Sequence, residues 1–178
     1  YSALMNTKVK IIAVQPDDDQ TLLDISYQTF YESFGPPINT EEDIQDYLSK
    51  HFTLEQINKE LQNSNSEFYF AVLETQIVGY IKVNYGNAQT ENIAGNTLEI
   101  ERIYVIEGLR GKKIGLSLLE KALVLAQQKL AEFVWLGVWK ENKRAIKFYL
   151  KNSFVAFDEH QFVLGTSVQT DLMMKRKL

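Results

Sequence analysis

The chain has 178 residues and a formal net charge of −4, and 45% of its residues are hydrophobic. That length allows one domain with a sizeable core, and no apolar run approaches the roughly 20 residues that span a bilayer. The lack of cysteine excludes disulfides, thiolate metal sites and a cysteine nucleophile, and two histidines are too few for a multi-histidine metal site. A chain without cysteine also fits the cytoplasm, and its acidic balance argues against direct nucleic-acid binding.

The first half of the chain is predicted to form a strand, three helices and a hairpin. Each predicted helix begins at residues that can cap a helix, and Gly35-Pro36-Pro37 ends the first of them. Two β-rich segments then follow, joined by a short turn, as in a hairpin. In chain order, these elements are a strand at 9–14, helices at 17–34, 40–48 and 53–61, and strands at 68–73 and 77–85.

The second half alternates strands and helices. Apolar residues recur at spacings of three and four between Leu116 and Leu130, which is typical of a helix with one face on a core. The next segment is almost entirely apolar, as in a strand that is buried on both faces. In chain order, these elements are a strand at 98–105, a helix at 116–130, a strand at 133–139, a helix at 142–151, and strands at 154–164 and 170–175.

This order of elements predicts a single-domain α/β fold. The strand–helix–strand unit from Leu98 to Trp139 favours two parallel strands joined by a right-handed crossover. The flanking hairpins are antiparallel, so we expect a mixed central β-sheet with helices on both faces. Met5 resembles a natural start, so we expect residues 1–4 to be a cloning remnant and the domain to span residues 5–178.

The most informative segment, Glu99–Ser117, reads as a strand that runs into a turn and then a helix. A turn with glycines and lysines before a helix points backbone N–H groups at one spot, which suits a phosphate or pyrophosphate. Glu99 and Glu101 are two residues apart, so regular pairing would point both carboxylates to the same side of the sheet. A phosphate site beside possible bases predicts an enzyme with a phosphate-bearing cosubstrate.

Charge is distributed unevenly along the chain. Between Pro16 and Asp46 there are nine acidic residues and no Lys or Arg, whereas Gly108–Lys121 carries four cations against Glu120. The acidic run has two interpretations, which both stay open at this point. It can form helix N-termini and solvated faces, or it can form a rim that attracts a cationic substrate.

Two motifs resemble those of the GCN5-related N-acetyltransferases (GNAT). Residues 110–115 are similar to motif A of that family, Gln/Arg-x-x-Gly-x-Gly/Ala, with Lys113 in place of the first glycine. Residues 142–149 are similar to Asn-x-x-Ala-x-x-Phe-Tyr. The family continues with Gly-Phe where this chain has Asn152-Ser153-Phe154, so we expect Asn152 to take the left-handed cap conformation.

Three further segments, 98–104, 135–139 and 169–172, resemble the PaiA-type branch, which are polyamine acetyltransferases. The resemblance covers essentially residues 5–178 and implies a GNAT domain. It implies direct transfer of the acetyl group of acetyl-CoA to a primary amine of a small cationic acceptor, such as spermidine or spermine, without a metal.

The same resemblance implies roles for individual residues. Tyr149 would be the general acid near the departing thiolate, and Glu101 or Glu99 would be the base, directly or through a water. The pyrophosphate would bind the turn before the helix, the pantetheine arm would lie along the strand edge, and Asn142 would make a polar contact. The expected cosubstrate-binding residues are Ile103, Tyr104, Val105, Arg110, Gly111, Lys112, Lys113, Ile114, Gly115, Leu116, Ser117 and Asn142.

Each of these residues also has a purely structural alternative. Tyr149 can be a core tyrosine, Asn142 a plain N-cap, and the two glutamates an exposed strand face with cross-strand pairs. The tryptophans Trp135 and Trp139 are expected in the core, and His51 and His160 are expected to be surface or satisfied core residues. Weaker candidates for the substrate side are Tyr31, Glu32 and the cluster Glu41–Asp43.

Three functions are compatible with these patterns. The first is a polyamine acetyltransferase. The second keeps the reaction and changes the acceptor to an amino sugar, an antibiotic amine or a peptide N-terminus. The third is a non-catalytic acyl-CoA-binding module that regulates through protein contacts, which the presence of Glu101, Asn142 and Tyr149 argues against. The sequence leaves both a monomer and a homodimer open.

Overall fold

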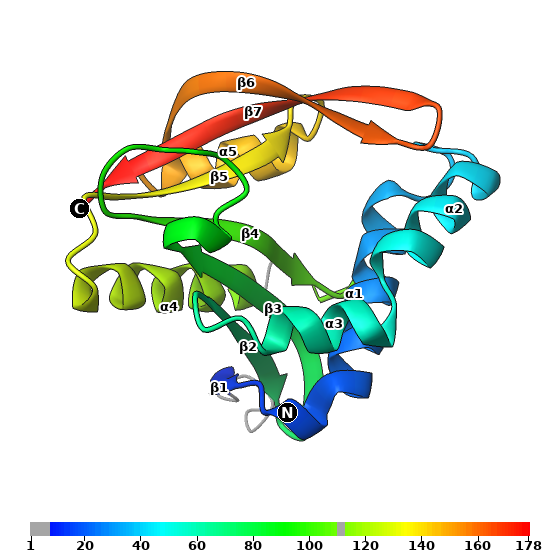
Figure 1. Ribbon diagram of the computed structural model, residues 1–178, viewed down its shortest axis with the longest axis horizontal. Coiled ribbons are helices and arrows are strands. Elements are labelled where there is room, and N and C mark those ends of the chain that lie inside the picture. The colour runs from blue at the N-terminus through cyan, green and yellow to red at the C-terminus, as the bar shows by residue number, and fades with distance from the viewer. Residues whose placement is uncertain (1–7, 110–112) are drawn as a thin grey trace, which may run out of the picture.

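The computed structural model describes residues 8–109 and 113–178, so the expected remnant at residues 1–4 lies outside the described residues. Every predicted helix and strand is present, with ends that differ by a few residues (Figure 1). In chain order, the elements are β1 (Lys10–Ala13), η2 (Pro16–Asp18), α1 (Asp19–Phe34), α2 (Glu41–His51), α3 (Leu54–Leu61), β2 (Ser66–Leu73), β3 (Gln76–Tyr85), η3 (Gly86–Ala88), β4 (Thr97–Val105), α4 (Ile114–Gln128), β5 (Phe133–Trp139), α5 (Lys143–Lys151), β6 (Val155–Leu164) and β7 (Ser167–Lys177).

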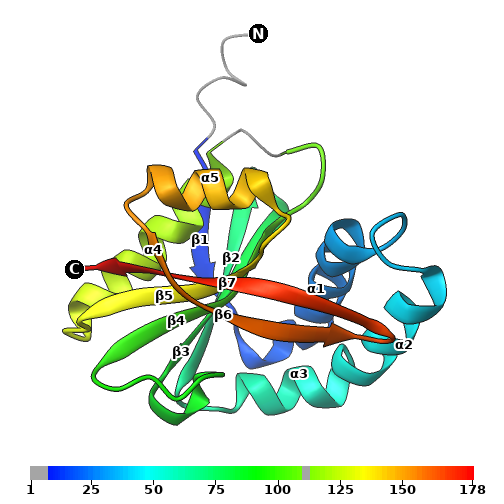
Figure 2. The same cartoon turned by 90° about the horizontal axis from the view of Figure 1, so that it is seen from above.

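Seven strands form one mixed sheet, which confirms the predicted fold class. Their spatial order is β1-β2-β3-β4-β5-β7-β6. β4 and β5 are parallel and are connected through α4, and the other neighbouring pairs are antiparallel. α4 and α5 lie on one side of the sheet, and α1, α2 and α3 lie on the other (Figure 2).

Two of the helices begin at the caps that the sequence predicts. The Thr40 hydroxyl accepts a hydrogen bond from the Asp43 N–H at 3.1 Å, and the Thr53 hydroxyl accepts one from the Gln56 N–H at 3.1 Å. Each hydroxyl satisfies an N–H group that the helix itself leaves without a partner, which is worth about 1 kcal/mol. These caps fix where α2 and α3 start beside the sheet.

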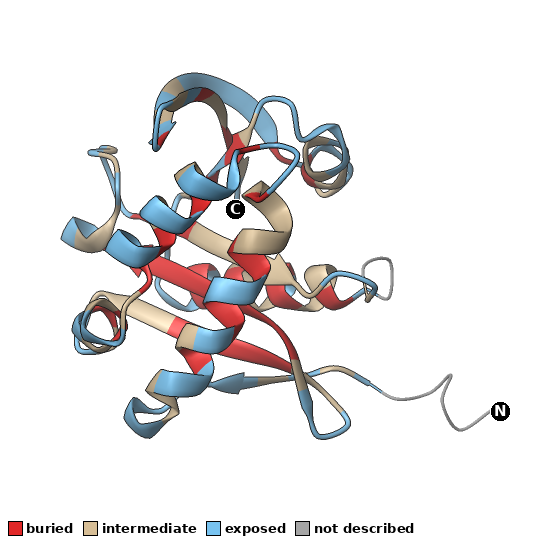
Figure 3. Cartoon of the chain, turned by 90° about the vertical axis from the view of Figure 1, so that its right-hand side faces the viewer, coloured by how far each residue is buried: buried red, intermediate tan, exposed pale blue. Residues whose placement is uncertain are grey.

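Alternate side chains of β2 belong to two different layers of the core, one on each face of the sheet. Tyr69 and Ala71 pack in the cluster that contains α4, whereas Phe68 and Phe70 pack in the cluster that contains α1 and α3. The central strands are accordingly buried on both faces (Figure 3). Trp135 is 1% exposed, as expected for a core residue, and its indole N–H donates to Gln89 Oε1 at 2.8 Å.

The parallel strands β4 and β5 are paired over only part of their length. Thr97–Ile100 pairs with Phe133–Leu136, and the register between the two strands ends there. Beyond that point β4 stays paired with β3, while β5 continues its pairing with β7. The two strands therefore separate in the middle of the sheet.

A β-bulge lies on β4 at the same point. Lys82 of β3 faces Arg102 and Val83 faces Ile100, so Glu101 is the extra residue on β4. A bulge interrupts strict alternation, and neighbouring side chains can then point to the same side of the sheet. Glu101 and Arg102 do so, since their charged groups lie 3.1 Å apart.

Candidate active site

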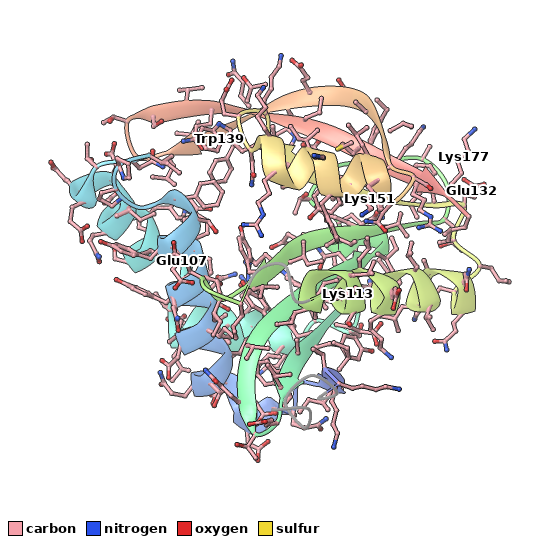
Figure 4. All side chains as sticks on the ribbon, turned by 180° about the vertical axis from the view of Figure 1, so that it is seen from behind. Glu107, Lys113, Glu132, Trp139, Lys151 and Lys177 are labelled. Atoms are coloured by element: carbon pink, nitrogen blue, oxygen red, sulfur yellow. The ribbon has the colours of Figure 1, made fainter. Side chains whose placement is uncertain are left out.

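A cavity of about 930 Å³ opens where β4 and β5 separate. We call its two sides the α4–α5 side and the α1 side, after the helices that line them. The lining of the α4–α5 side includes Lys113, Asn142, Lys143, Arg144, Tyr149 and Lys151. The lining of the α1 side includes Glu32, Phe34, Ile38, Glu101, Arg102 and Trp139. Figure 4 shows the cavity region from behind, with Lys113 and Lys151 near α4 and α5, and Glu107 and Trp139 toward α1.

The first turn of α4 forms one end of the α4–α5 side. Lys113 is the N-cap and has a left-handed backbone with φ of 62°, although it is not glycine. The first N–H groups of an α-helix have no partner within the helix, so those of residues 114–116 can bind an anion. Ser117 is turned inward instead, because its N–H and its hydroxyl both donate to the Lys113 carbonyl at 3.1 Å. The expected residues Arg110, Gly111 and Lys112 lie outside the described residues.

The separated part of β4 forms the floor of the cavity. Ile103, Tyr104 and Val105 line the cavity and remain paired with β3 on their other edge. Within the described residues, no strand pairs with their second edge, because the register with β5 ends at Ile100. That edge can offer N–H and C=O groups to a bound chain, which is the geometry predicted for a pantetheine arm.

The start of α5 places an amide at the cavity. The Asn142 side chain accepts a hydrogen bond from the Ala145 N–H at 3.1 Å, as an N-cap does, and Asn142 also lines the cavity. Both interpretations of this residue therefore agree with the structure.

Tyr149 lies about two helical turns after Asn142, on the same face of α5. It is 7% exposed, its ring contacts those of Phe148 and Phe154 edge-on, and it lines the cavity. Burial raises the pKa of Tyr149 above its ordinary value, so the hydroxyl stays protonated near neutral pH. The residue is thus a packed tyrosine and a possible proton donor at once.

The end of α5 corrects one expectation. Ser153, with φ of 70°, takes the left-handed conformation, and Asn152 does not, with φ of −99°. The Phe154 N–H donates to the Tyr149 carbonyl and the Ser153 N–H to the Leu150 carbonyl, which is the Schellman pattern. In that pattern the left-handed residue is the second after the last helical residue, Lys151. The prediction of Asn152 was therefore wrong by one position. The Asn152 amide instead donates to the Phe148 carbonyl at 2.8 Å.

Glu101 is held in a closed set of four ion pairs. Its carboxylate lies 2.9 Å from Lys82 Nζ and 3.1 Å from Arg102 Nη2. Glu60 of α3 contacts the same two cations at 2.6 and 3.0 Å. Burial alone would raise the pKa of Glu101, but Arg102 and Lys82 lower it below its ordinary value. Glu101 is therefore an ionised, well-anchored carboxylate and a weak proton acceptor.

Glu99 shares a contact with Glu101 but faces a different environment. Asn84 Nδ2 donates to both carboxylates at 2.9 Å, so the two side chains do point to one side of the sheet. Glu99 is 3% exposed, and it also accepts hydrogen bonds from the Thr90 N–H and hydroxyl. Burial raises the pKa of Glu99, although these hydrogen bonds oppose the rise. Its carboxylate anchors the loop after η3, and the cavity lining runs from Ile100 onward, so the structure gives little support to Glu99 as a base.

The α1 side agrees with the expectation at Glu32 and differs from it at Trp139, Tyr31 and the cluster Glu41–Asp43. Trp139, expected in the core, lines the cavity, and Glu32 is the one weaker substrate-side candidate that lines it among the described residues. Tyr31 donates instead to Glu41 at 2.7 Å, and Asp43 accepts from the Thr166 hydroxyl of the β6–β7 turn at 2.8 Å. The first contact joins α1 to α2, the second docks the end of the β6–β7 hairpin on α2, and together they give the acidic run a structural use.

Sequence reasoning missed two members of the ion-pair set around Glu101. Glu60 lies on α3 and Lys82 lies in the middle of β3, 22 residues apart in the chain. A lysine inside an otherwise apolar strand is the signal that could have indicated a buried ion pair, because lysine is almost never buried without one. Nothing in the local pattern of α3 indicates which of its carboxylates would meet that lysine.

Two negative findings apply to the described ranges 8–109 and 113–178. They contain no group of three His, Asp or Glu side chains placed to hold a metal ion. Their helices include none that is both long and apolar enough to cross a membrane.

Comparison with known proteins places these features in context. The model of the Acetyltransferase (GNAT) family matches residues 24–154. The chain is 36% identical over 172 residues to the uncharacterized N-acetyltransferase in pepI 3'region of Lactobacillus delbrueckii subsp. lactis, covering 97% of this chain and 99% of that one. It is 25% identical over 154 residues to a spermidine N(1)-acetyltransferase of Thermoplasma acidophilum, covering 84% of this chain and 90% of that one.

A solved structure shares the fold. The crystal structure of the PaiA N-acetyltransferase from Thermoplasma acidophilum in complex with coenzyme A has a TM-score of 0.76 to this chain. The two are 23% identical, and the match covers 96% of this chain and 99% of that one.

Proposed function

Because the chain belongs to the acetyltransferase (GNAT) family and is an acetyl-CoA-dependent N-acetyltransferase, we propose that its acceptor is a primary amine of a small polycation, such as spermidine or spermine. The observation that carries this proposal is the division of charge across the cavity. Among the described residues, the α4–α5 side presents four cations, Lys113, Lys143, Arg144 and Lys151. The carboxylates of the lining are Glu32, Glu101 and Glu141, and the cation of the α1 side, Arg102, is ion-paired with Glu101. A phosphate-bearing cosubstrate suits the first side, and a cationic acceptor suits the carboxylates.

The residues of the α4–α5 side are proposed to hold acetyl-CoA. The N–H groups at the start of α4 suit the pyrophosphate, with Lys113 adding charge, and the unpaired edge of Ile103–Val105 suits the pantetheine arm. The acetyl carbonyl would then lie where β4 and β5 separate. Holding both reactants in one geometry supplies much of the rate in a direct transfer.

The Tyr149 hydroxyl is proposed to donate a proton to the departing sulfur. Its burial keeps it protonated, and it lies on the cavity wall. The acceptor amine also has to lose a proton, because an alkylamine has a pKa near that of lysine, about 10.4, and only its neutral form attacks. Of the two glutamates predicted as bases, Glu101 lines the cavity, but its ion pairs suit it better to orienting a cationic amine.

A second acceptor class follows from the same ion pairs. Lys82 and Arg102 balance the charge of Glu60 and Glu101, so the α1 side attracts a polycation less strongly than its carboxylates alone would. An amino sugar or a peptide N-terminus would tolerate that balance. The cytoplasmic location and the choice between monomer and homodimer remain predictions.

The test is a thiol-release assay with acetyl-CoA against a panel of amines. The panel contains spermidine, spermine, putrescine, an amino sugar and a short peptide with a free N-terminus. We expect kcat/KM to be highest for spermidine or spermine. We also expect it to fall as salt rises from about 50 to about 500 mM, because salt screens the attraction between opposite charges. A neutral amino sugar that performs as well as spermidine, without salt dependence, would remove the polyamine assignment and leave the acetyltransferase activity intact.

A further inference from the structure

One half-buried carboxylate beside the separated strands has no role in the site described above. Asp171 of β7 pairs with Trp139 of β5 on one side and with His160 of β6 on the other. Directly paired residues of antiparallel strands point to the same face, so these three side chains form a row across three strands. Trp139 lines the cavity, and the row therefore begins at the cavity wall.

Asp171 is not itself in the cavity lining, but the missing side chain of Gly137 leaves space between its carboxylate and the backbone of β5. Gly137 lines the cavity and lies two residues before Trp139, on the same face of β5. A Cβ atom at this position would lie 3.5 Å from Asp171 Oδ2 and 3.5 Å from His160 Cε1. The missing side chain thus exposes the carboxylate and the imidazole to the space next to the backbone of β5.

The Asp171 carboxylate is unusually free for a group in this position. Its side chain is 19% exposed, and it accepts no hydrogen bond from the described residues; the nitrogen of an ionisable side chain that lies within 4 Å is His160 Nε2, at 3.8 Å. Burial raises the pKa of Asp171 above its ordinary value, and His160 opposes the rise. Glu101 has the opposite character, because two cations and Asn84 already satisfy it.

We propose that Asp171 is the group that receives the proton of the acceptor ammonium, directly or through one water in the opening at Gly137. This inference rests on the proposed transfer to an amine. The ammonium R–NH₃⁺ gives one proton to the carboxylate and becomes R–NH₂. The nitrogen then forms the C–N bond as the C–S bond of the thioester breaks. A second nitrogen proton replaces the one that Tyr149 gives to the sulfur, so the products are the amide and the free thiol.

Two groups behind Asp171 lead away from the cavity. His160 lies next to it, and His160 Nδ1 lies 3.5 Å from the carboxylate of Glu91 in the loop after η3. The exposed fraction of the side chains rises along this line, from 19% for Asp171 to 32% for His160 and 39% for Glu91. A water that bridges the 3.8 Å between Asp171 and His160 would let the proton pass to the imidazole and on to solvent, which restores the carboxylate for the next turnover.

The test compares Asp171→Asn with the wild type over pH 6.5–10, with spermidine or the fastest amine of the panel. At pH 7 we expect kcat to fall about 100-fold, in the lower part of the range for loss of a positioned base. Near pH 10 the loss should shrink at least tenfold, because a large share of the amine is then already neutral. Coenzyme A affinity by calorimetry should stay within twofold, since Asp171 lies away from the α4–α5 side.

Asp158→Asn, an exposed carboxylate on β6, is the matched control and should behave as the wild type. An Asp171→Asn loss that is equal at every pH, or smaller than threefold at pH 7, would overturn the inference. If Asp171→Asn does not fold, Gly137→Ala decides. Its methyl group meets Asp171 and His160 at ordinary contact distance, so the fold should hold while the opening closes. An unchanged kcat in Gly137→Ala would also overturn the inference. A wild type without thiol release on any amine would remove the proposed function itself.

Discussion

The two sides of the cavity are built in different ways. The α4–α5 side comes from two short stretches of consecutive residues, the first turn of α4 and the helix α5, and its cations are solvent-exposed or partly so. The lining of the α1 side comes mainly from α1, β4 and β5, and two of its charges, Glu101 and Arg102, are ion-paired with Lys82 of β3 and Glu60 of α3 behind it. Local backbone geometry shapes the first side, and long-range ion pairs shape the second.

This difference suits the two sides to different ligands, the cosubstrate on the α4–α5 side and the acceptor on the α1 side. A pyrophosphate needs N–H groups and exposed positive charge, which one turn and one helix start can supply on their own. An acceptor amine needs a carboxylate that stays ionised and a second group that takes up a proton. The first needs a lowered pKa and the second a raised pKa, so one carboxylate cannot serve as both. Glu101, with its pKa lowered, and Asp171, with its pKa raised, have the two environments that this requires.

The largest effect is expected from removing one charge of the ion-pair set. Glu60→Gln leaves Lys82 and Arg102 buried with Glu101 as their remaining carboxylate. Breaking a buried pair typically costs 3–5 kcal/mol, so we expect the free energy of unfolding to fall by about 3 kcal/mol, measured by urea unfolding. Coenzyme A binding to folded protein should change little, because Glu60 acts on the α1 side alone.

The control for that prediction is the exposed pair Lys140–Glu159. These side chains are 2.8 Å apart and are about half exposed, so Glu159→Gln should leave the unfolding midpoint nearly unchanged. Equal unfolding midpoints for the two variants would mean that the buried set contributes no more than a surface pair. Burial of the charges on the α1 side would then make no measurable difference to the free energy of unfolding.

A second prediction concerns Tyr149, which lies where the two sides meet. Tyr149→Phe keeps the ring and its contacts with Phe148 and Phe154 and removes only the hydroxyl. We expect kcat and kcat/KM to fall together by about 100-fold, because a proton donated to the departing sulfur matters only in the transition state. Steady-state kinetics measures kcat and kcat/KM, and calorimetry measures the affinity for coenzyme A. An unchanged kcat would leave Tyr149 as a packing residue.

The difference between local geometry and long-range contacts also explains which features could be predicted from the sequence. The order of strands and helices, the parallel unit β4–α4–β5 and the caps at Thr40, Thr53 and Asn142 depend on patterns within a few residues, and the structure confirms them. Five described candidates of the α4–α5 side, Lys113, Gly115, Leu116, Asn142 and Tyr149, line one cavity, whereas Ile114 and Ser117 are not in its lining. Their roles stay predictions.

The α1 side was less accessible to sequence reasoning, for physical reasons. The bulge at Glu101 arises from the register between β3 and β4, and no local pattern fixes that register. Lys82 and Arg102 reach Glu60 only because α3 docks on the sheet, and the row through Asp171 needs three strands to meet. Ser153 shows the limit on a smaller scale, since the left-handed position at the end of α5 depends on where the last helical turn closes.

A third prediction tests the α4–α5 side. A Cβ at Gly115 would meet Phe148 Cζ at 4.0 Å, which is open enough for a methyl group but not for a branched side chain beside the helix start. We therefore expect Gly115→Val to weaken coenzyme A binding by about tenfold, or 1.4 kcal/mol, while Gly115→Ala stays near the wild type. Calorimetric titration gives both values. Equal affinity in the valine variant, with the fold intact, would mean that the cosubstrate does not approach this turn.

The smallest effect is expected where the chain takes a left-handed backbone without glycine. Lys113 and Ser153 have φ of 62° and 70°, and a side chain there costs about 1–2 kcal/mol, against about 0.5–1 kcal/mol of chain entropy that glycine loses on folding. Lys113→Gly and Ser153→Gly should each raise the free energy of unfolding by about 0.5–1 kcal/mol. Only Lys113→Gly removes a cation from the cavity lining, so only that variant should weaken coenzyme A binding, by a few-fold and more at low salt. Equal affinities in the two variants would show that position 113 contributes its backbone alone. Lower stability in both would mean that the two turns hold their conformation without strain.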